Sequence, residues 1–131
     1  MILDTSFLVD VMNDDEAALA KVDEIERDRL TQRVPAMTVQ ELFIGVGASE
    51  IPTAERRKIR RIVDSRPIVE TTPEIARKAG RIDGRLRSEG ERIDAGDATI
   101  GATGLVFDEP VVTGNGKHFE RIPELEVETY G

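Results

Sequence analysis

The amino-acid sequence contains no cysteine among its 131 residues and only one histidine. The absence of cysteine excludes disulfide bonds, thiolate metal sites and cysteine nucleophiles together. No apolar run approaches the ~20 residues of a membrane-spanning helix. No basic segment precedes an apolar stretch near the N-terminus, as it would in a signal peptide. We therefore expect a cytoplasmic protein that makes no membrane contact.

Positive charge is also scarce, because 18 Lys and Arg residues face 26 Asp and Glu residues and leave a net charge of −8. Nucleic-acid binding depends on Lys and Arg, which neutralise phosphate groups. On its face this balance argues against a nucleic-acid partner. The objection weakens if the acids cluster, because a bound divalent cation then offsets their charge locally.

Most of the bases are arginines, and they gather on two expected helices. Residues 54–64 combine five basic side chains with apolar positions at helical spacing, and Arg77, Arg81 and Arg85 fall four apart on another helix. Such clusters are usually solvated surface. Their alternative interpretation is a rim that contacts phosphate groups around a metal site.

The chain has the length of one domain, over residues 1–131, without internal repeats or linkers. Short apolar runs alternate with helical patterns, which predicts an α/β fold with a mostly parallel sheet of about five strands and helices on both faces. A loop is expected at residues 51–53. The expected strands are residues 1–3, 33–37, 67–69, 110–113 and 125–129.

The first ten residues carry the first candidate for a functional site. A strand ends at Asp4, and either Thr5 or Ser6 can cap the helix that follows. In open α/β sheets, ligands bind at the carboxyl edge of the strands. The simpler alternative is that Asp4 only caps this helix. A functional role therefore depends on further acids at the same edge.

Further acids do reach that edge. Glu41 follows the second strand, although its spacing from Thr38 also fits a capping box. Asp94 or Asp97 opens the helix that leads to the fourth strand, and Asn115 follows that strand. The helix that leads to the fourth strand is unusually rich in small residues. Glycine inside a helix is less favourable than alanine by about 1 kcal/mol. We therefore expect this helix to pack closely against a neighbour and to hold its leading acid rigidly.

Several carboxylates without a cysteine or histidine partner select Mg²⁺ or Mn²⁺ over zinc. Such an ion activates water and offsets the charge that develops on a phosphate group, which points to metal-assisted phosphoryl transfer. His118 is a candidate general base, but we expect it to be a surface or packing residue. Four phenylalanines are expected to be core residues rather than base-stacking platforms: Phe7, Phe43, Phe107 and Phe119.

Four segments resemble the signature segments of the PIN domain: I-L-D-T-S-F-L-V-D, T-V-Q-E-L-F-I-G, D-A-T-I-G-A-T-G and V-V-T-G-N-G-K-H-F. They occur in the right order and cover essentially the whole chain. The size of the chain is similar to that of VapC, the ribonuclease toxin of VapBC toxin–antitoxin pairs. The resemblance implies a PIN-like α/β/α sandwich with strand order 3-2-1-4-5 and a homodimer. It also implies Mg²⁺- or Mn²⁺-dependent RNA cleavage and a VapB-like antitoxin that covers the active site.

Carried over residue by residue, the resemblance makes Asp4, Glu41 and Asp97 the metal-binding acids. Asn115 matches the fourth catalytic position, where many members have Asp, so we expect one tightly bound metal rather than two. Asp94 competes with Asp97 for the third position. The supporting hydroxyl positions are Thr5 or Ser6 and Thr113.

Gly114 departs from the family pattern, which usually shows a larger or basic residue in this turn. The departure puts some substrate contacts in doubt, but not the metal site.

The function implied is that of an endoribonuclease, the toxin component of a type II toxin–antitoxin system. It would hydrolyse RNA with a metal-activated water and leave a 5′-phosphate and a 3′-hydroxyl. One alternative is a housekeeping PIN nuclease of RNA processing or decay. Another is a catalytically silent PIN module that binds RNA or protein. A phosphatase of the haloacid-dehalogenase kind needs a second Asp two residues after Asp4, where Ser6 stands.

Overall fold

The computed structural model describes residues 1–50 and 52–131, and within them five parallel strands form the centre of the fold. The order β1-β4-β5 forms one sheet, and β2 pairs with β3. A parallel bridge between Ile2 and Arg33 joins the two parts, so the strands follow the predicted order 3-2-1-4-5. The strands are β1 (Ile2–Leu3), β2 (Val34–Pro35), β3 (Ile68–Val69), β4 (Val111–Val112) and β5 (Val127–Glu128).

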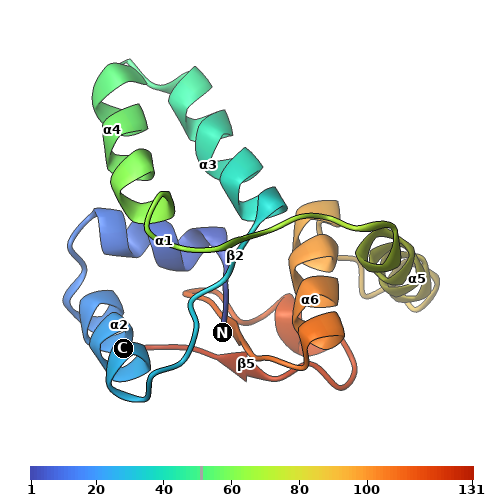
Figure 1. Ribbon diagram of the computed structural model, residues 1–131. Helices are drawn as coiled ribbons and strands as arrows, with labels where there is room; N and C mark the ends of the chain where they lie inside the picture. The colour runs from blue at the N-terminus through green and yellow to red at the C-terminus, as the bar shows by residue number, and fades with distance from the viewer. Residues whose placement is uncertain (51) are drawn as a thin grey trace.

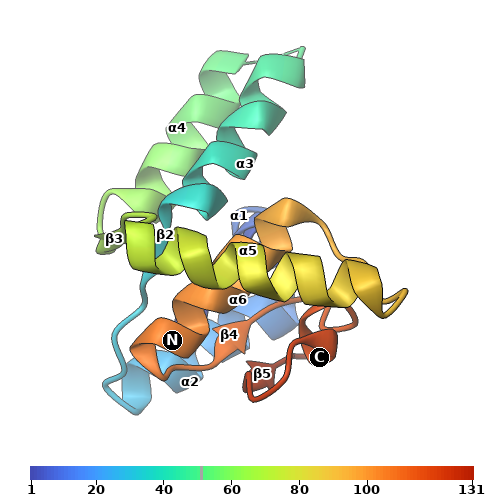
Figure 2. The same cartoon turned by 90° about the vertical axis from the view of Figure 1, so that its right-hand side faces the viewer.

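Helices lie on both faces of this sheet, as Figure 1 shows with α1 and α2 on one side and α5 and α6 on the other. In both views α3 and α4 run side by side and project beyond the sheet (Figure 2). No helix in the described part of the chain is long and apolar enough to cross a membrane. The helices are α1 (Thr5–Met12), α2 (Glu16–Arg27), α3 (Ala36–Ala48), α4 (Pro52–Val63), α5 (Pro73–Ser88) and α6 (Ala95–Phe107), followed by the 3-10 turn η1 (Phe119–Arg121).

Two hydrophobic cores flank the sheet, because successive residues of a strand point to opposite faces. Leu3 and Val112 belong to the core under α1–α4, whereas Ile2 and Val111 belong to the core under α5 and α6. Strands of only two residues therefore supply both cores. The result is the α/β/α sandwich predicted from the sequence.

The small residues of α6 pack closely against their neighbours, as predicted. A Cβ atom at Gly104 would lie 2.9 Å from Leu125, 3.0 Å from the Glu109 carbonyl oxygen and 3.1 Å from the β4 residue Val111. At Gly101 it would collide with Ile122. The glycines thus allow α6 to lie directly on the sheet, which fixes the position of its first turn.

Two predicted helix starts are wrong. Helix α3 begins at Ala36, so Thr38 lies inside it and does not cap it; its buried hydroxyl donates to the Leu3 carbonyl oxygen at 3.0 Å. The N-cap position of α1 is occupied by Asp4, not by Thr5 or Ser6. In both cases a tertiary contact uses the side chain that the local pattern assigned to a cap.

Two of the four phenylalanines differ from the prediction. Phe7 and Phe119 are buried, whereas Phe43 and Phe107 are 41% and 37% exposed. Phe43 lies on α3, which projects from the sheet and is covered there only in part. Of the loop expected at 51–53, residue 51 lies outside the described residues, and Pro52 begins α4.

Candidate active site

Asp4 lies at the end of β1, where its side chain is 5% exposed. The carboxylate makes no capping hydrogen bond to α1, so the interpretation of Asp4 as a helix cap is wrong for its side chain. Instead Oδ2 accepts from Ser6 Oγ at 2.8 Å and from Thr113 Oγ1 at 2.7 Å. Both described hydrogen bonds fall on this one oxygen, which leaves Oδ1 for a ligand.

The turn after β4 is joined to the start of α1 by the same hydroxyl groups. Ser6 Oγ and Thr113 Oγ1 lie 3.0 Å apart. The backbone N–H of Gly114 donates to Ser6 Oγ at 2.9 Å, and that of Asn115 donates to Thr113 Oγ1 at 3.0 Å. Because Thr113 is completely buried, this network fixes the orientation of the Asp4 carboxylate.

Glu41 reaches the same place from the second turn of α3. Thr5 Oγ1 donates to Glu41 Oε1 at 2.6 Å. A Cβ atom at Gly96 would lie only 2.7 Å from Glu41 Oε2, so the carboxylate uses space that a side chain at Gly96 would occupy. Burial raises the pKa of Glu41 despite the hydrogen bond from Thr5, and the nearby charges of Asp4, Asp97 and Asp94 raise it further. Gly96 therefore provides the space through which Glu41 meets the start of α6.

Asp94 and Asp97 come from the start of α6. Asp94 occupies the N-cap position without a capping hydrogen bond from its side chain, and Asp97 lies in the first turn. Asp97 Oδ2 lies 3.0 Å from His118 Nδ1. Burial raises the pKa of Asp97, with the charges of Asp4 and Asp94 acting in the same direction and the contact with His118 opposing them.

The structure thus brings four carboxylates together: Asp4, Glu41, Asp94 and Asp97. Among the described residues, no Lys or Arg forms an ion pair with any of the four. Acids of like charge without a cationic partner repel one another and disfavour ionisation, the more so where they are partly buried. A divalent cation with oxygen ligands suits such a group, so these residues fit a metal.

Asn115 lies in the turn after β4, where its backbone N–H donates to Thr113 Oγ1, and the residue is exposed. Sequence reasoning missed Gly96, and it named His118 only as a candidate general base. Gly96 makes room for Glu41, and His118 contacts Asp97 although it was expected to be a surface or packing residue. The only signal for His118 was its place three residues after Asn115, within the segment that leads away from β4.

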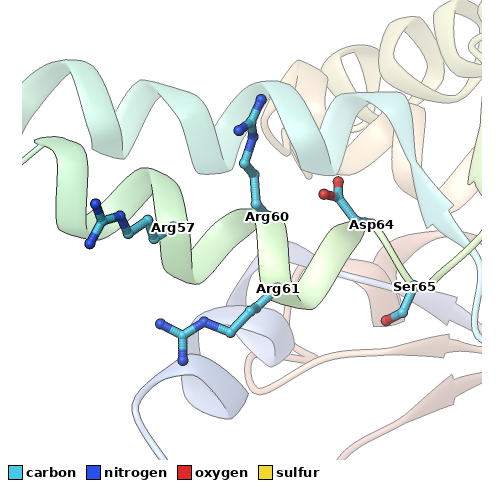
Figure 3. Close-up of a pocket in the computed structure, with 5 residues that line it drawn as sticks. All are labelled: Arg57, Arg60, Arg61, Asp64 and Ser65. Atoms are coloured by element: carbon cyan, nitrogen blue, oxygen red, sulfur yellow. The ribbon is translucent and has the colours of Figure 1, made fainter.

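The arginines of α4 do not converge on these acids. Arg57, Arg60 and Arg61 line a surface pocket together with Asp64 and Ser65, and their guanidinium groups point in different directions (Figure 3). This arrangement offers no single position for an anion. It agrees with the interpretation of the cluster as solvated surface.

Comparison with known proteins now identifies the family. The family model of the PIN domain matches residues 1–125. Ribonuclease VapC19 of Mycobacterium tuberculosis is 30% identical over 125 residues, which cover 95% of this chain and 96% of that protein.

Two solved structures share the fold. The crystal structure of VapBC2 from Rickettsia felis bound to a promoter DNA fragment matches with a TM-score of 0.90 at 21% identity, over 99% of this chain and 98% of that chain. DNA-bound VapBC from Salmonella typhimurium matches with a TM-score of 0.86 at 22% identity, over 98% and 96%. The family model and the relative together cover nearly the whole sequence, so the chain belongs to the PIN domain family.

Proposed function

We propose that this chain is a VapC-type endoribonuclease that depends on a divalent metal and acts as the toxin of a type II toxin–antitoxin pair. The observation that carries the proposal is the convergence of four carboxylates from the end of β1, from α3 and from the start of α6, with no Lys or Arg ion-pair partner in the described part of the chain. The relative named Ribonuclease VapC19 supports the choice of RNA as the substrate.

In this proposal Asp4, Glu41 and Asp97 hold Mg²⁺ or Mn²⁺, directly or through water. The bound ion supplies a more acidic water and offsets charge on the phosphate group. The other residues of the site orient these ligands. Ser6 and Thr113 fix Asp4 through Oδ2, and Thr5 fixes Glu41 through Oε1. Such supporting hydrogen bonds set the position and basicity of metal-binding carboxylates.

Asn115 takes the fourth position of the site. Its backbone N–H is held by Thr113 Oγ1, while the residue itself is exposed to solvent and open to a substrate. An amide carries no charge, so it adds less to the affinity for a cation than Asp would. We therefore keep the expectation of one tightly bound ion, with Asp94 as the further carboxylate of the site.

The partners follow from the same proposal. The structural neighbours were solved as VapBC complexes, which supports a VapB-like antitoxin that binds this chain and covers the acids. We also propose that residues 1–131 form one PIN domain, that two copies form a homodimer and that the protein acts in the cytoplasm.

The test is cleavage of total cellular RNA by purified protein in the presence of Mn²⁺, in EDTA, and with the Asp97→Asn variant. Asp23→Asn is the matched control, because Asp23 is an exposed carboxylate on α2. We expect discrete fragments with 5′-phosphate ends that require both the metal and Asp97. Equal cleavage by Asp97→Asn would contradict the mechanism. An absence of both cleavage and metal binding would favour the silent module instead.

A further inference from the structure

We infer that His118 is itself a metal ligand, which binds the ion of this site through its imidazole together with Asp97 and Asp94 and makes the site prefer Mn²⁺ to Mg²⁺. The inference rests on the proposed metal-dependent function and goes beyond it. The sequence favoured an all-oxygen site because no histidine was expected near the acids. The structure supplies one.

The spacing of the three side chains fits a shared cation. His118 Nδ1 and Asp97 Oδ2 lie 3.0 Å apart, and one ligand atom from each of Asp94, Asp97 and His118 lies within 4.8 Å of the others. Bonds of about 2.1 Å from one ion place two neighbouring ligand atoms about 3.0 Å apart. The observed separation therefore needs little adjustment on binding.

The site is open to an ion from solvent. The side chains of His118 and Asp97 are 37% and 19% exposed, so neither is sealed inside the core. Asp94 is exposed and its carboxylate makes no capping hydrogen bond to α6. A metal ion in solution can thus reach all three side chains without any opening of the fold.

The backbone around His118 is held firmly in place. Phe119, the next residue, is 1% exposed and anchors the segment in the core. The Arg121 backbone N–H donates to the His118 carbonyl oxygen at 3.1 Å, and Arg121 Nη1 donates to the Arg92 carbonyl oxygen at 2.9 Å. These contacts tie the turn that carries His118 to the segment that leads into α6. The imidazole is therefore preorganised opposite Asp97.

The competing interpretation is that His118 only positions Asp97 by donating a hydrogen bond. The two roles differ in the state of Nδ1, which needs a lone pair as a ligand and a proton as a donor. Asp94 favours the ligand role, because its carboxylate belongs to the same group of three. A hydrogen bond between His118 and Asp97 gives no reason for a second negative charge at that point.

Nitrogen ligation has a measurable consequence for the choice of metal. Mn²⁺ is a first-row transition ion and can accept an imidazole nitrogen beside oxygen ligands, whereas Mg²⁺ is bound through carboxylates and retained waters. Removing the imidazole should therefore weaken binding of Mn²⁺ by at least the roughly tenfold that is lost with a mere supporting partner of a ligand. Binding of Mg²⁺ should change by less than about threefold.

The experiment combines two readouts on wild type, His118→Ala and His118→Asn. Calorimetric titration gives the affinities for Mn²⁺ and Mg²⁺, and pulsed electron paramagnetic resonance detects a nitrogen-14 nucleus bonded to Mn²⁺. His118→Asn is the critical variant, because its amide N–H can replace the donor near the Nδ1 position but not the imidazole ligand. We expect the imidazole nitrogen signal in the wild type alone, and weak Mn²⁺ binding in both variants.

Each other outcome has a definite meaning. Wild type that binds Mn²⁺ without a nitrogen signal overturns the role of His118 as a ligand and leaves the metal-dependent nuclease standing. His118→Asn with wild-type affinity for Mn²⁺ also overturns it, in favour of a positioning residue. Wild type that binds neither ion overturns the inference and the proposed metal dependence together.

Discussion

A methyl group at Gly96 should disturb the metal site while sparing the fold. In Gly96→Ala, the new Cβ would lie 2.7 Å from Glu41 Oε2 and 3.3 Å from Glu41 Cδ. Ordinary contacts begin at 3.4 Å, so the carboxylate has to retreat by about 0.7 Å. The flexible side chain of Glu41 can do so, whereas the backbone of α6 is fixed by its packing on the sheet.

The size of the effect follows from the contacts of Glu41. A retreat of this extent weakens the 2.6 Å hydrogen bond from Thr5, which positions the Glu41 carboxylate. Loss of such a supporting contact typically lowers metal affinity about 10–100-fold, so we expect Gly96→Ala to bind Mn²⁺ more weakly by about that factor. The free energy of unfolding should fall by less than that hydrogen bond contributes, because Ala favours a helix over Gly by up to about 1 kcal/mol.

Calorimetric titration with Mn²⁺ measures this change. Gly84→Ala is the matched control, because Gly84 also lies inside a helix, α5, and its Cβ would meet nothing within 4 Å. We expect the control to bind Mn²⁺ like the wild type. Shortening the acid in Gly96→Ala/Glu41→Asp should recover part of the affinity. If folded Gly96→Ala binds Mn²⁺ with wild-type affinity, Glu41 does not contribute to the metal site.

Two further outcomes concern stability. Gly114→Ala should lower the melting temperature, because its Cβ would lie 2.5 Å from the Tyr130 hydroxyl. Adding Tyr130→Phe, which removes that hydroxyl, should offset part of the loss. If the shifts in melting temperature of the two single variants simply add in the double variant, the two residues are not in contact. Burial alone would raise the pKa of Glu109, but hydrogen bonds from the Met1 ammonium group and Arg33 lower it below the ordinary 4.5. Glu109 therefore stabilises the fold above pH 4.5, and that stability is lost as the pH falls through the lowered pKa. Denaturant titrations should show a smaller loss on acidification in Glu109→Gln.

The parallel sheet and the carboxylates at its edge could be predicted from short-range patterns, whereas the strand order was implied only by the resemblance to the PIN domain. Asp4 follows directly from the apolar strand β1 and precedes a helix, and Glu41 lies in the second turn of the helix that follows β2. Parallel strands with right-handed connections then place such residues at one edge. Neither inference needs to know which side chains touch.

The predicted helix caps failed for the opposite reason. The spacing of Thr38 and Glu41 fits a capping box, but each side chain has a partner in another element. Thr38 donates to the Leu3 carbonyl oxygen, and Glu41 accepts from Thr5, 36 positions earlier in the chain. A local pattern cannot exclude such long-range partners, and at a functional site they replace the local bonds.

Gly114 shows how a departure from a family pattern can be compensated elsewhere in a chain. The missing side chain leaves a space that is filled by the hydroxyl of Tyr130, which donates to Asp10 Oδ2 at 2.6 Å. The ring of Tyr130 in turn packs on Phe7, with 5.2 Å between the ring centres. The turn that orients Asp4 is thus supported by residues from α1 and from the C-terminal end of the chain. The sequence shows the glycine, but only the fold shows what occupies its place.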